Sequence, residues 1–196
     1  MRAIYAWTFG LLLIGGAASL AAEAVRPTPD SSLERIGRAD SAVASWPSIP
    51  RRAAELMMGK YGAPQAISED SLIWTRTAPW KRITVRRDSP GADPSAVLEQ
   101  AVTYDVPLER QDAALALPGG VKWNPGLREL TVQGEFEERN FMAVNIADKV
   151  LSGRVSPREG REMHARALEL ARAGKSSPLT LGLTFTPPSG DAPPRP

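Results

Sequence analysis

The chain has 196 residues, of which 42% are hydrophobic and 23% charged, a balance that is typical of a folded globular domain. Its 24 basic and 22 acidic side chains leave a net charge of +2, too weak a field to indicate a nucleic-acid partner. The sequence has no cysteine and one histidine, which excludes disulfides, thiolate metal sites and cysteine nucleophiles. Because a transition-metal site would lack its preferred ligands, we expect no metal and no cofactor.

Residues 1–24 have the pattern of a secretory signal peptide. Arg2 precedes an uncharged run over residues 3–20, and an Ala-x-Ala cleavage pattern ends at Ala24, with Ala21 as a second cleavage position. The run approaches the length of a membrane span, so a retained anchor is the alternative. Because small residues follow the run, we expect cleavage, no transmembrane segment in the mature protein, and a periplasmic or secreted location.

The first half of the mature chain is expected to form a leader, two helices and a β-hairpin. Residues 25–31 read as a flexible leader. Helices are predicted over 32–45 and 50–60, the second ending at Gly62, which suits a helix C-terminus. Strands near 71–77 and 80–87, joined at Ala78-Pro79, are predicted to pair as a hairpin.

The middle of the chain is less regular. Residues 97–106 fit both a helix and a strand, so we predict a turn of helix that passes into a strand. A short helix is expected over 107–117, stopped by Pro118-Gly119-Gly120. Strands near 121–123 and 127–133 follow, separated by a turn at residues 124–126.

The last third predicts a pair of helices. A wide apolar stripe marks a helix over 135–151, and a capping box from Ser156 to Glu159 opens a second helix that closes at Gly174. The short connection predicts antiparallel packing. An extended segment over 179–185 and a disordered proline-rich tail over 186–196 complete the chain.

These elements together predict one α+β domain over residues 32–185. Its antiparallel sheet is expected to have about four to five strands. N-terminal helices and a C-terminal helical hairpin are expected to pack on that sheet.

Basic and aromatic residues of the predicted hairpin form the strongest candidate binding surface. Arg82 and Arg86 would share one strand face, opposite a face of apolar side chains. Tryptophan and arginine are enriched at protein interfaces, and positive charge would suit an anionic partner. The alternatives are a solvated strand face for the arginines and core positions for the tryptophans. The candidate binding residues are Trp74, Arg76, Trp80, Arg82 and Arg86.

An enzymatic alternative rests on carboxylates in the 135–148 region. Glu135, Glu137 and Glu138 cluster at a helix start, with Asp148 three turns later, and paired acids perform general acid and base catalysis in glycosidases. Acidic residues in a first helical turn also stabilise the helix dipole, which is the structural alternative.

Three further polar residues lie within the last two helices. His164, at the edge of an apolar stripe, is interpreted as a boundary residue with neither a catalytic nor a metal-binding role. Asn140 and Asn145 are unusual inside an apolar helix, so they are expected to tie down a neighbouring loop or, as the alternative, to face a pocket.

Residues 32–106 resemble a known module. The stretch Lys60-Tyr61-Gly62-Ala63-Pro64, followed by Leu72-Ile73-Trp74, is similar to the signature of the small lipoprotein of the outer-membrane β-barrel assembly complex. This resemblance implies two helices on a three-stranded antiparallel sheet. The lipid-attachment cysteine of that lipoprotein is missing here.

The whole chain also resembles a family of exported bacterial proteins that has no assigned activity. This resemblance implies an exported domain, and it carries no functional residue across. It rests on residues 61–64, 79–82, 104–107 and 140–145.

We therefore expect an exported, non-enzymatic binding protein of the bacterial envelope, with an envelope protein or an anionic envelope component as its partner. An exported hydrolase that cleaves an envelope polymer through the 135–148 carboxylates is the alternative. A third hypothesis is a small-ligand binder with a pocket under the helical hairpin.

Overall fold

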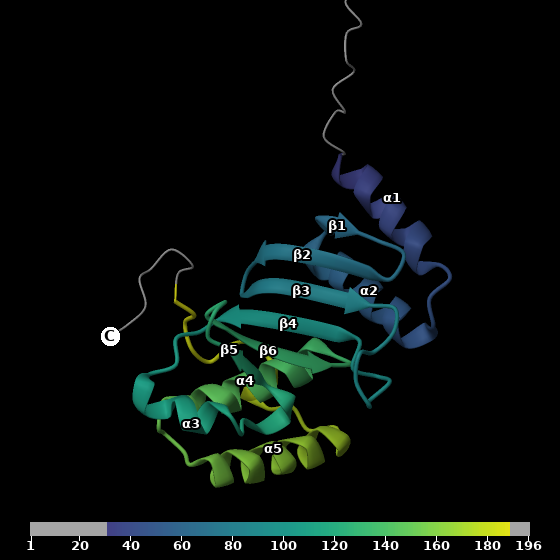
Figure 1. The fold of residues 1–196 in the computed structure, drawn as a ribbon. Helices are drawn as coiled ribbons and strands as arrows, with labels where there is room; N and C mark the ends of the chain where they lie inside the picture. The colour runs from purple at the N-terminus through teal and green to yellow at the C-terminus, as the bar shows by residue number, and fades with distance from the viewer. Residues whose placement is uncertain (1–30, 189–196) are drawn as a thin grey trace, which may run out of the picture.

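The computed structural model describes residues 31–188, drawn in colour in Figure 1. The predicted signal peptide, its cleavage positions, residues 25–30 of the leader and residues 189–196 of the tail lie outside the described residues. Among the residues that are described, no helix is both long enough and apolar enough to cross a membrane.

The fold is α+β, as predicted, and is built on a six-stranded antiparallel sheet with the strand order β1-β2-β3-β4-β6-β5. The strand at Ala66–Ile67 was not predicted, because an element of two residues cannot display the alternation that marks a strand. The strands are β1 (Ala66–Ile67), β2 (Ser71–Thr77), β3 (Trp80–Arg86), β4 (Leu98–Thr103), β5 (Lys122–Asn124) and β6 (Glu129–Gly134).

The two N-terminal helices are confirmed as α1 (Ser32–Val43) and α2 (Ser48–Tyr61). Ser31, placed in the leader by the sequence analysis, instead caps α1 through a capping box with Glu34. Gly62 ends α2 with a φ of 75°, a conformation that glycine adopts without a steric penalty. In the view of Figure 1, α2 lies behind the sheet and α1 lies beside the edge strand β1.

The first hairpin is also confirmed. Strands β2 and β3 pair antiparallel, with Leu72 opposite Val85 and Trp74 opposite Ile83. All four side chains are fully buried, so this register places one face of the hairpin in the core.

The segment over 97–106 is a strand alone, and the predicted turn of helix is wrong. Asp93 instead accepts hydrogen bonds from the backbone nitrogen and the hydroxyl of Ser95, which forms a turn just before β4. Strand β4 then pairs with β3 on one side and β6 on the other. Sheet pairing on both sides outweighs the local helical tendency.

The expected helix over 107–117 is reduced to a 3-10 turn at Leu108–Arg110 and one turn of helix, α3 (Gln111–Ala114). A second 3-10 turn, Pro118–Gly120, leads into β5. The turn at residues 124–126 is confirmed, with Asn124 Oδ1 accepting from the Leu127 nitrogen at 3.1 Å.

The helical hairpin is confirmed as α4 (Glu137–Leu151) and α5 (Pro157–Arg172). The predicted capping box at the start of α5 is present, with Ser156 and Glu159 bonded reciprocally. Figure 1 shows α4 between the sheet and α5, with α5 packed on α4 and not on the sheet. Helix α4 is therefore buried on almost every side, and Trp80 of β3 stacks on its Phe141 at 4.9 Å between ring centroids.

Asn145 ties down a loop, as expected. Its Nδ2 donates to the carbonyl oxygens of Leu179 and Gly182 at 2.9 and 2.7 Å, and its Oδ1 accepts from the Thr184 nitrogen at 2.8 Å. The segment predicted to be extended over 179–185 is instead a 3-10 turn, Pro178–Thr180, followed by irregular chain. Hydrogen bonds to one buried side chain hold this segment in place of sheet pairing.

Candidate functional site

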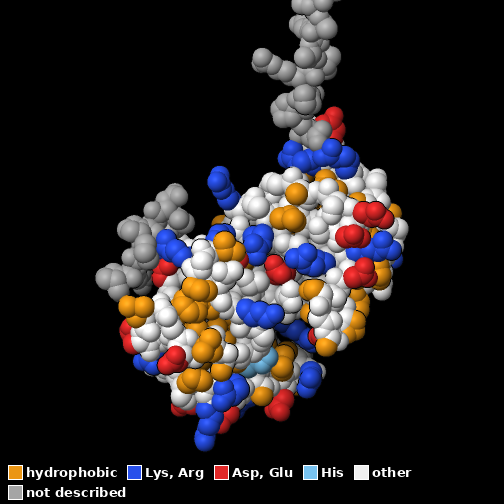
Figure 2. All heavy atoms as spheres, in the orientation of Figure 1, with side chains coloured by type: hydrophobic (Ala, Val, Ile, Leu, Met, Phe, Trp, Pro, Cys, Tyr) orange, Lys and Arg blue, Asp and Glu red, His pale blue; other side chains and the backbone are white. Residues whose placement is uncertain are grey.

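The two faces of the sheet differ in what covers them. Figure 1 shows α2 and α4 on the far face, while no helix of the described part lies over β2, β3 and β4 on the near face. Figure 2 shows basic and acidic side chains spread over this near face. We call it the uncovered face of the sheet.

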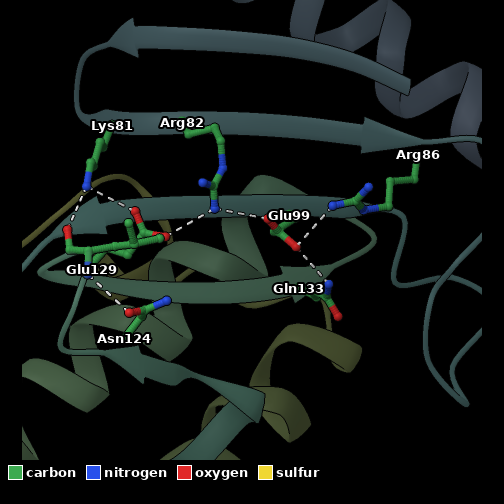
Figure 3. A network of polar contacts seen from close by, with 8 residues as sticks. Lys81, Arg82, Arg86, Glu99, Asn124, Glu129 and Gln133 are labelled. Carbon is green, nitrogen blue, oxygen red and sulfur yellow. Dashed lines mark hydrogen bonds and ion pairs between the residues drawn. The ribbon is translucent and has the colours of Figure 1, made fainter. Parts of the chain in front are cut away.

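A network of charged side chains lies on the uncovered face (Figure 3). Arg82 of β3 is its centre, since its Nη2 donates to Glu99 Oε1 on β4 and to Glu129 Oε1 on β6, at 3.2 Å each. Lys81 Nζ lies 3.2 Å from the second oxygen of Glu129 and donates to the carbonyl oxygen of Leu127 at 2.7 Å. One arginine therefore bridges three strands.

The other end of the network is looser. Arg86 Nη2 lies 3.7 Å from Glu99 Oε2, within ion-pair range but too far for a hydrogen bond. Gln133 of β6 donates its Nε2 to the same Glu99 oxygen at 3.0 Å. Of the cations in the network, Arg86 is thus the least constrained.

The charges of this network are layered by depth. The side chains of Lys81, Arg82 and Arg86 are 41%, 31% and 40% exposed, whereas those of Glu99 and Glu129 are 14% and 2% exposed. Three cations against two carboxylates leave a net charge of +1, and that positive charge is on the solvent side. The uncovered face therefore presents cations outward while its carboxylates hold them from below.

The structure brings together only some of the candidate binding residues that were predicted on the hairpin. Arg82 and Arg86 share one face of β3, as predicted, and the apolar residues between them are buried on the opposite face. Arg76 is exposed near the end of β2, with a φ of 54°, and takes no part in this network.

The two tryptophans of the predicted set are core residues, which is the alternative that the sequence analysis left open. Trp74 is fully buried and Trp80 is 2% exposed, so neither presents a surface to a partner. The Trp74 ring nitrogen donates to the Gly62 carbonyl oxygen at 2.9 Å, which anchors the end of α2.

Four members of the network were missed by the sequence analysis. Glu99, Glu129 and Gln133 alternate with buried apolar residues of β4 and β6, so strand periodicity places them on the polar face. Their pairing with Arg82 requires the strand order β3-β4-β6 and its register, which local periodicity does not contain. Lys81 was not among the candidate binding residues.

A second polar centre lies inside the covered side of the sheet. Glu137, at the start of α4 and 5% exposed, pairs with Lys60 and accepts hydrogen bonds from three neutral donors. Burial alone would raise the pKa of this carboxyl, but these hydrogen bonds outweigh burial and hold the pKa below its ordinary value. Burial, the hydrogen bond to Glu137 and its negative charge together raise the pKa of Tyr61. The neutral donors are Tyr61, Trp80 and Gln100.

Glu137 therefore joins α2, β3, β4 and α4 through one carboxylate. Such a carboxylate has its lone pairs occupied by protein donors and has a low affinity for a proton, so it is poorly suited to act as a general acid. Of the two neighbouring acids, Glu135 is partly exposed and Glu138 is exposed.

The remaining acid of the hydrolase hypothesis lies far away. Asp148 is 11 residues beyond Glu137 on the same helix, which at 1.5 Å per residue separates their Cα atoms by about 16 Å. Paired carboxylates of glycosidases lie about 5 to 9.5 Å apart. Asp148 pairs with Arg154 and accepts from the Tyr104 hydroxyl at 3.0 Å. These two acids do not form a catalytic pair.

No group of three or more metal-binding side chains lies together in the described residues. His164 is half-buried on α5 beside Gly119, and burial lowers its pKa, so its imidazole is neutral at pH 7. This position at the edge of the helix agrees with the interpretation of His164 as a boundary residue.

Comparisons with protein-family models, with curated proteins and with solved structures found no match to this chain. The resemblance of residues 32–106 to the lipoprotein module and that of the whole chain to an exported family therefore stay predictions.

Proposed function

We propose that this chain is an exported, non-enzymatic binding protein of the bacterial envelope that docks an acidic surface of an envelope protein on its uncovered sheet face. The observation that carries this proposal is the layering of charge, with exposed cations above buried carboxylates. Complementary charge steers association and selects partners, so outward cations favour an acidic partner.

The position of Arg82 strengthens this argument. Its two hydrogen bonds to carboxylates fix the guanidinium on the sheet, so little side-chain entropy is left to lose when a partner binds. Arg86 and Lys81, on either side of it along β3, keep donors that are free to bond to a partner. A polar sheet face that no helix of the described residues covers suits a protein surface better than a small substrate.

The test is affinity capture from the native envelope extract of the source bacterium, with the mature protein as bait. Wild type is compared with a double variant, Lys81→Gln with Arg86→Gln, which removes exposed charge but keeps Arg82 over the buried carboxylates. The matched control, Arg161→Gln with Arg166→Gln, removes the same charge from exposed positions on α5.

We expect wild type and the control to capture one stoichiometric protein that the Lys81/Arg86 variant does not retain. Raised salt should release this protein, because exposed charges are screened. Retention of the same protein by the Lys81/Arg86 variant, or capture that is insensitive to salt, would refute the proposed docking face.

A further inference from the structure

A small pocket lies where the end of β6 meets the two helices of the hairpin. Its volume is about 180 Å³, well above the roughly 30 Å³ that one water molecule occupies in the liquid. The pocket therefore has room for a small organic molecule. Its polar lining residues are Asp93, Gln133, Glu135, Arg139, Asn140 and His164.

Two glycines shape the wall of this pocket. A Cβ at Gly119, which has a φ of 70°, would lie 2.8 Å from His164 Nε2. A Cβ at Gly134 would lie 2.5 Å from Asn140 Oδ1. Both polar side chains thus lie directly against the backbone, and a side chain at either glycine would push them away.

The pocket contains hydrogen-bonding groups that the protein does not use. Asn140 is 1% exposed, and its Nδ2 donates to Leu98 O at 3.2 Å and Gln100 Oε1 at 2.9 Å. Its Oδ1 is buried without a partner among the described residues, which is unfavourable for a polar atom. No hydrogen bond joins His164 to the described part of the chain either, and burial keeps its ring neutral.

Charges of both signs line the same pocket. Hydrogen bonds from Ser95 lower the pKa of Asp93, and the charge of Arg139 adds to this effect, so Asp93 is ionised within the field of Arg139. Both residues line the pocket, and no ion pair joins them. Glu135 supplies a second carboxylate.

We propose that this pocket binds a free α-amino acid, with its carboxylate on Arg139 and its ammonium group on Asp93 and Glu135. A simple anion would meet the carboxylates and a simple cation would meet the arginine, whereas a zwitterion complements both. His164, which lines the same pocket, donates to the carboxylate. Gln133 lines this pocket and also donates to Glu99 in the network of the uncovered face, but none of the contacts assigned here uses Gln133.

Ligand binding can be measured through the NMR signals of His164, because it is the only histidine in the sequence. In a tag-free preparation of the mature protein, the imidazole C–H signals in the proton NMR spectrum report on His164 alone. We expect glycine and L-alanine, titrated to millimolar concentrations, to shift these signals saturably. Acetate and methylamine, which carry only one of the two charges, should produce no saturable shift.

Two variants test the assigned contacts. Arg139→Gln and Asp93→Asn should each weaken amino-acid binding about tenfold or more, because each loses a charge-assisted hydrogen bond. Arg166→Gln, an exposed position on α5 that does not line the pocket, should bind like wild type. An unshifted His164 signal in the ligand-free variants shows that the pocket remains folded.

The proposal is refuted if neither amino acid gives a saturable shift, or if acetate or methylamine shifts the His164 signals to the same extent. Unchanged binding by Arg139→Gln would refute it equally.

Discussion

Both faces of the sheet contain nearly buried carboxylates, but the two faces satisfy them in different ways. On the covered side, Glu137 is satisfied by three neutral donors and by Lys60, and its contacts reach α2, β3 and β4. On the uncovered face, cations provide the charge that opposes Glu99 and Glu129, and those cations stay partly in water.

This difference separates a structural centre from a surface that can exchange partners. Neutral donors buried with a carboxylate lose their only acceptor when it is removed, which makes the covered cluster costly to break. Exposed cations can be replaced by water or can bond to a second molecule, so the uncovered network is less important for stability and more available for binding.

The largest expected effect is on the covered side. Glu137→Ala leaves the Trp80 and Gln100 donors buried without an acceptor, and should lower the free energy of unfolding by about 3 kcal/mol. Lys60 adds little to this loss, because its side chain is 51% exposed and can be solvated. Urea unfolding measures the effect. The control is Glu138→Ala, at an exposed neighbouring position, which should change the free energy of unfolding by less than about 0.5 kcal/mol. An equal loss of stability in both variants would show that the buried cluster around Glu137 has no special structural role.

A pH series sharpens the same comparison. Because the pKa of Glu137 is lower in the folded state than its ordinary value of 4.5, its contribution to stability is present above that value and is lost as the pH falls through the folded pKa. The stability gap between wild type and Glu137→Gln should therefore be widest near neutral pH and narrow in acid. A gap that is constant down to strongly acidic pH would show that ionised Glu137 is not what the cluster stabilises.

The next effect falls on the uncovered face. Arg82→Ala leaves Glu129, which is 2% exposed, with Lys81 as its remaining cation, and should cost about 1–2 kcal/mol. High salt should reduce this cost, because the network is partly exposed to screening ions, whereas the cost of Glu137→Ala should persist. Urea unfolding at low and high salt compares the two variants, and an equal response to salt would contradict the contrast between the faces.

The smallest effect on stability is expected for Arg86→Gln. Its side chain is 40% exposed and lies 3.7 Å from Glu99, so its loss should change the free energy of unfolding by less than about 0.5 kcal/mol. Thermal unfolding checks this value. A loss as large as that of Arg82→Ala would make Arg86 a structural residue and would remove it from the docking face.

Local signals in the sequence predicted most elements of the fold. The capping box at Ser156, the glycine at position 62 and the apolar alternation of 71–77 and 80–86 each act within a few residues, so a single chain displays them. The similar capping box at Ser31 was visible in the sequence and was missed, because residues 25–31 were read together as a leader.

The candidate site was less predictable. Periodicity placed Arg82 and Arg86 on one face of a strand but could not tell whether Trp80 faces the core or the solvent. That choice depends on Glu137, 57 residues further along the chain, whose carboxylate accepts a hydrogen bond from the Trp80 ring nitrogen at 2.6 Å. Contacts between residues so far apart in the chain are set by strand order and helix packing. Neither of these produces a local pattern in the sequence.

The sequence by itself thus determined the class of fold, the cysteine-free composition, the hairpin and the helical pair, because caps, turns and hydrophobic periodicity are short-range effects. Only the tertiary structure decided that the two tryptophans are core and that carboxylates lie beneath the exposed cations. It alone also brought His164, Asn140 and Arg139 around one pocket. These arrangements depend on the register of β3, β4 and β6 and on the packing of α4 and α5, where segments distant in the chain must meet before their side chains can interact.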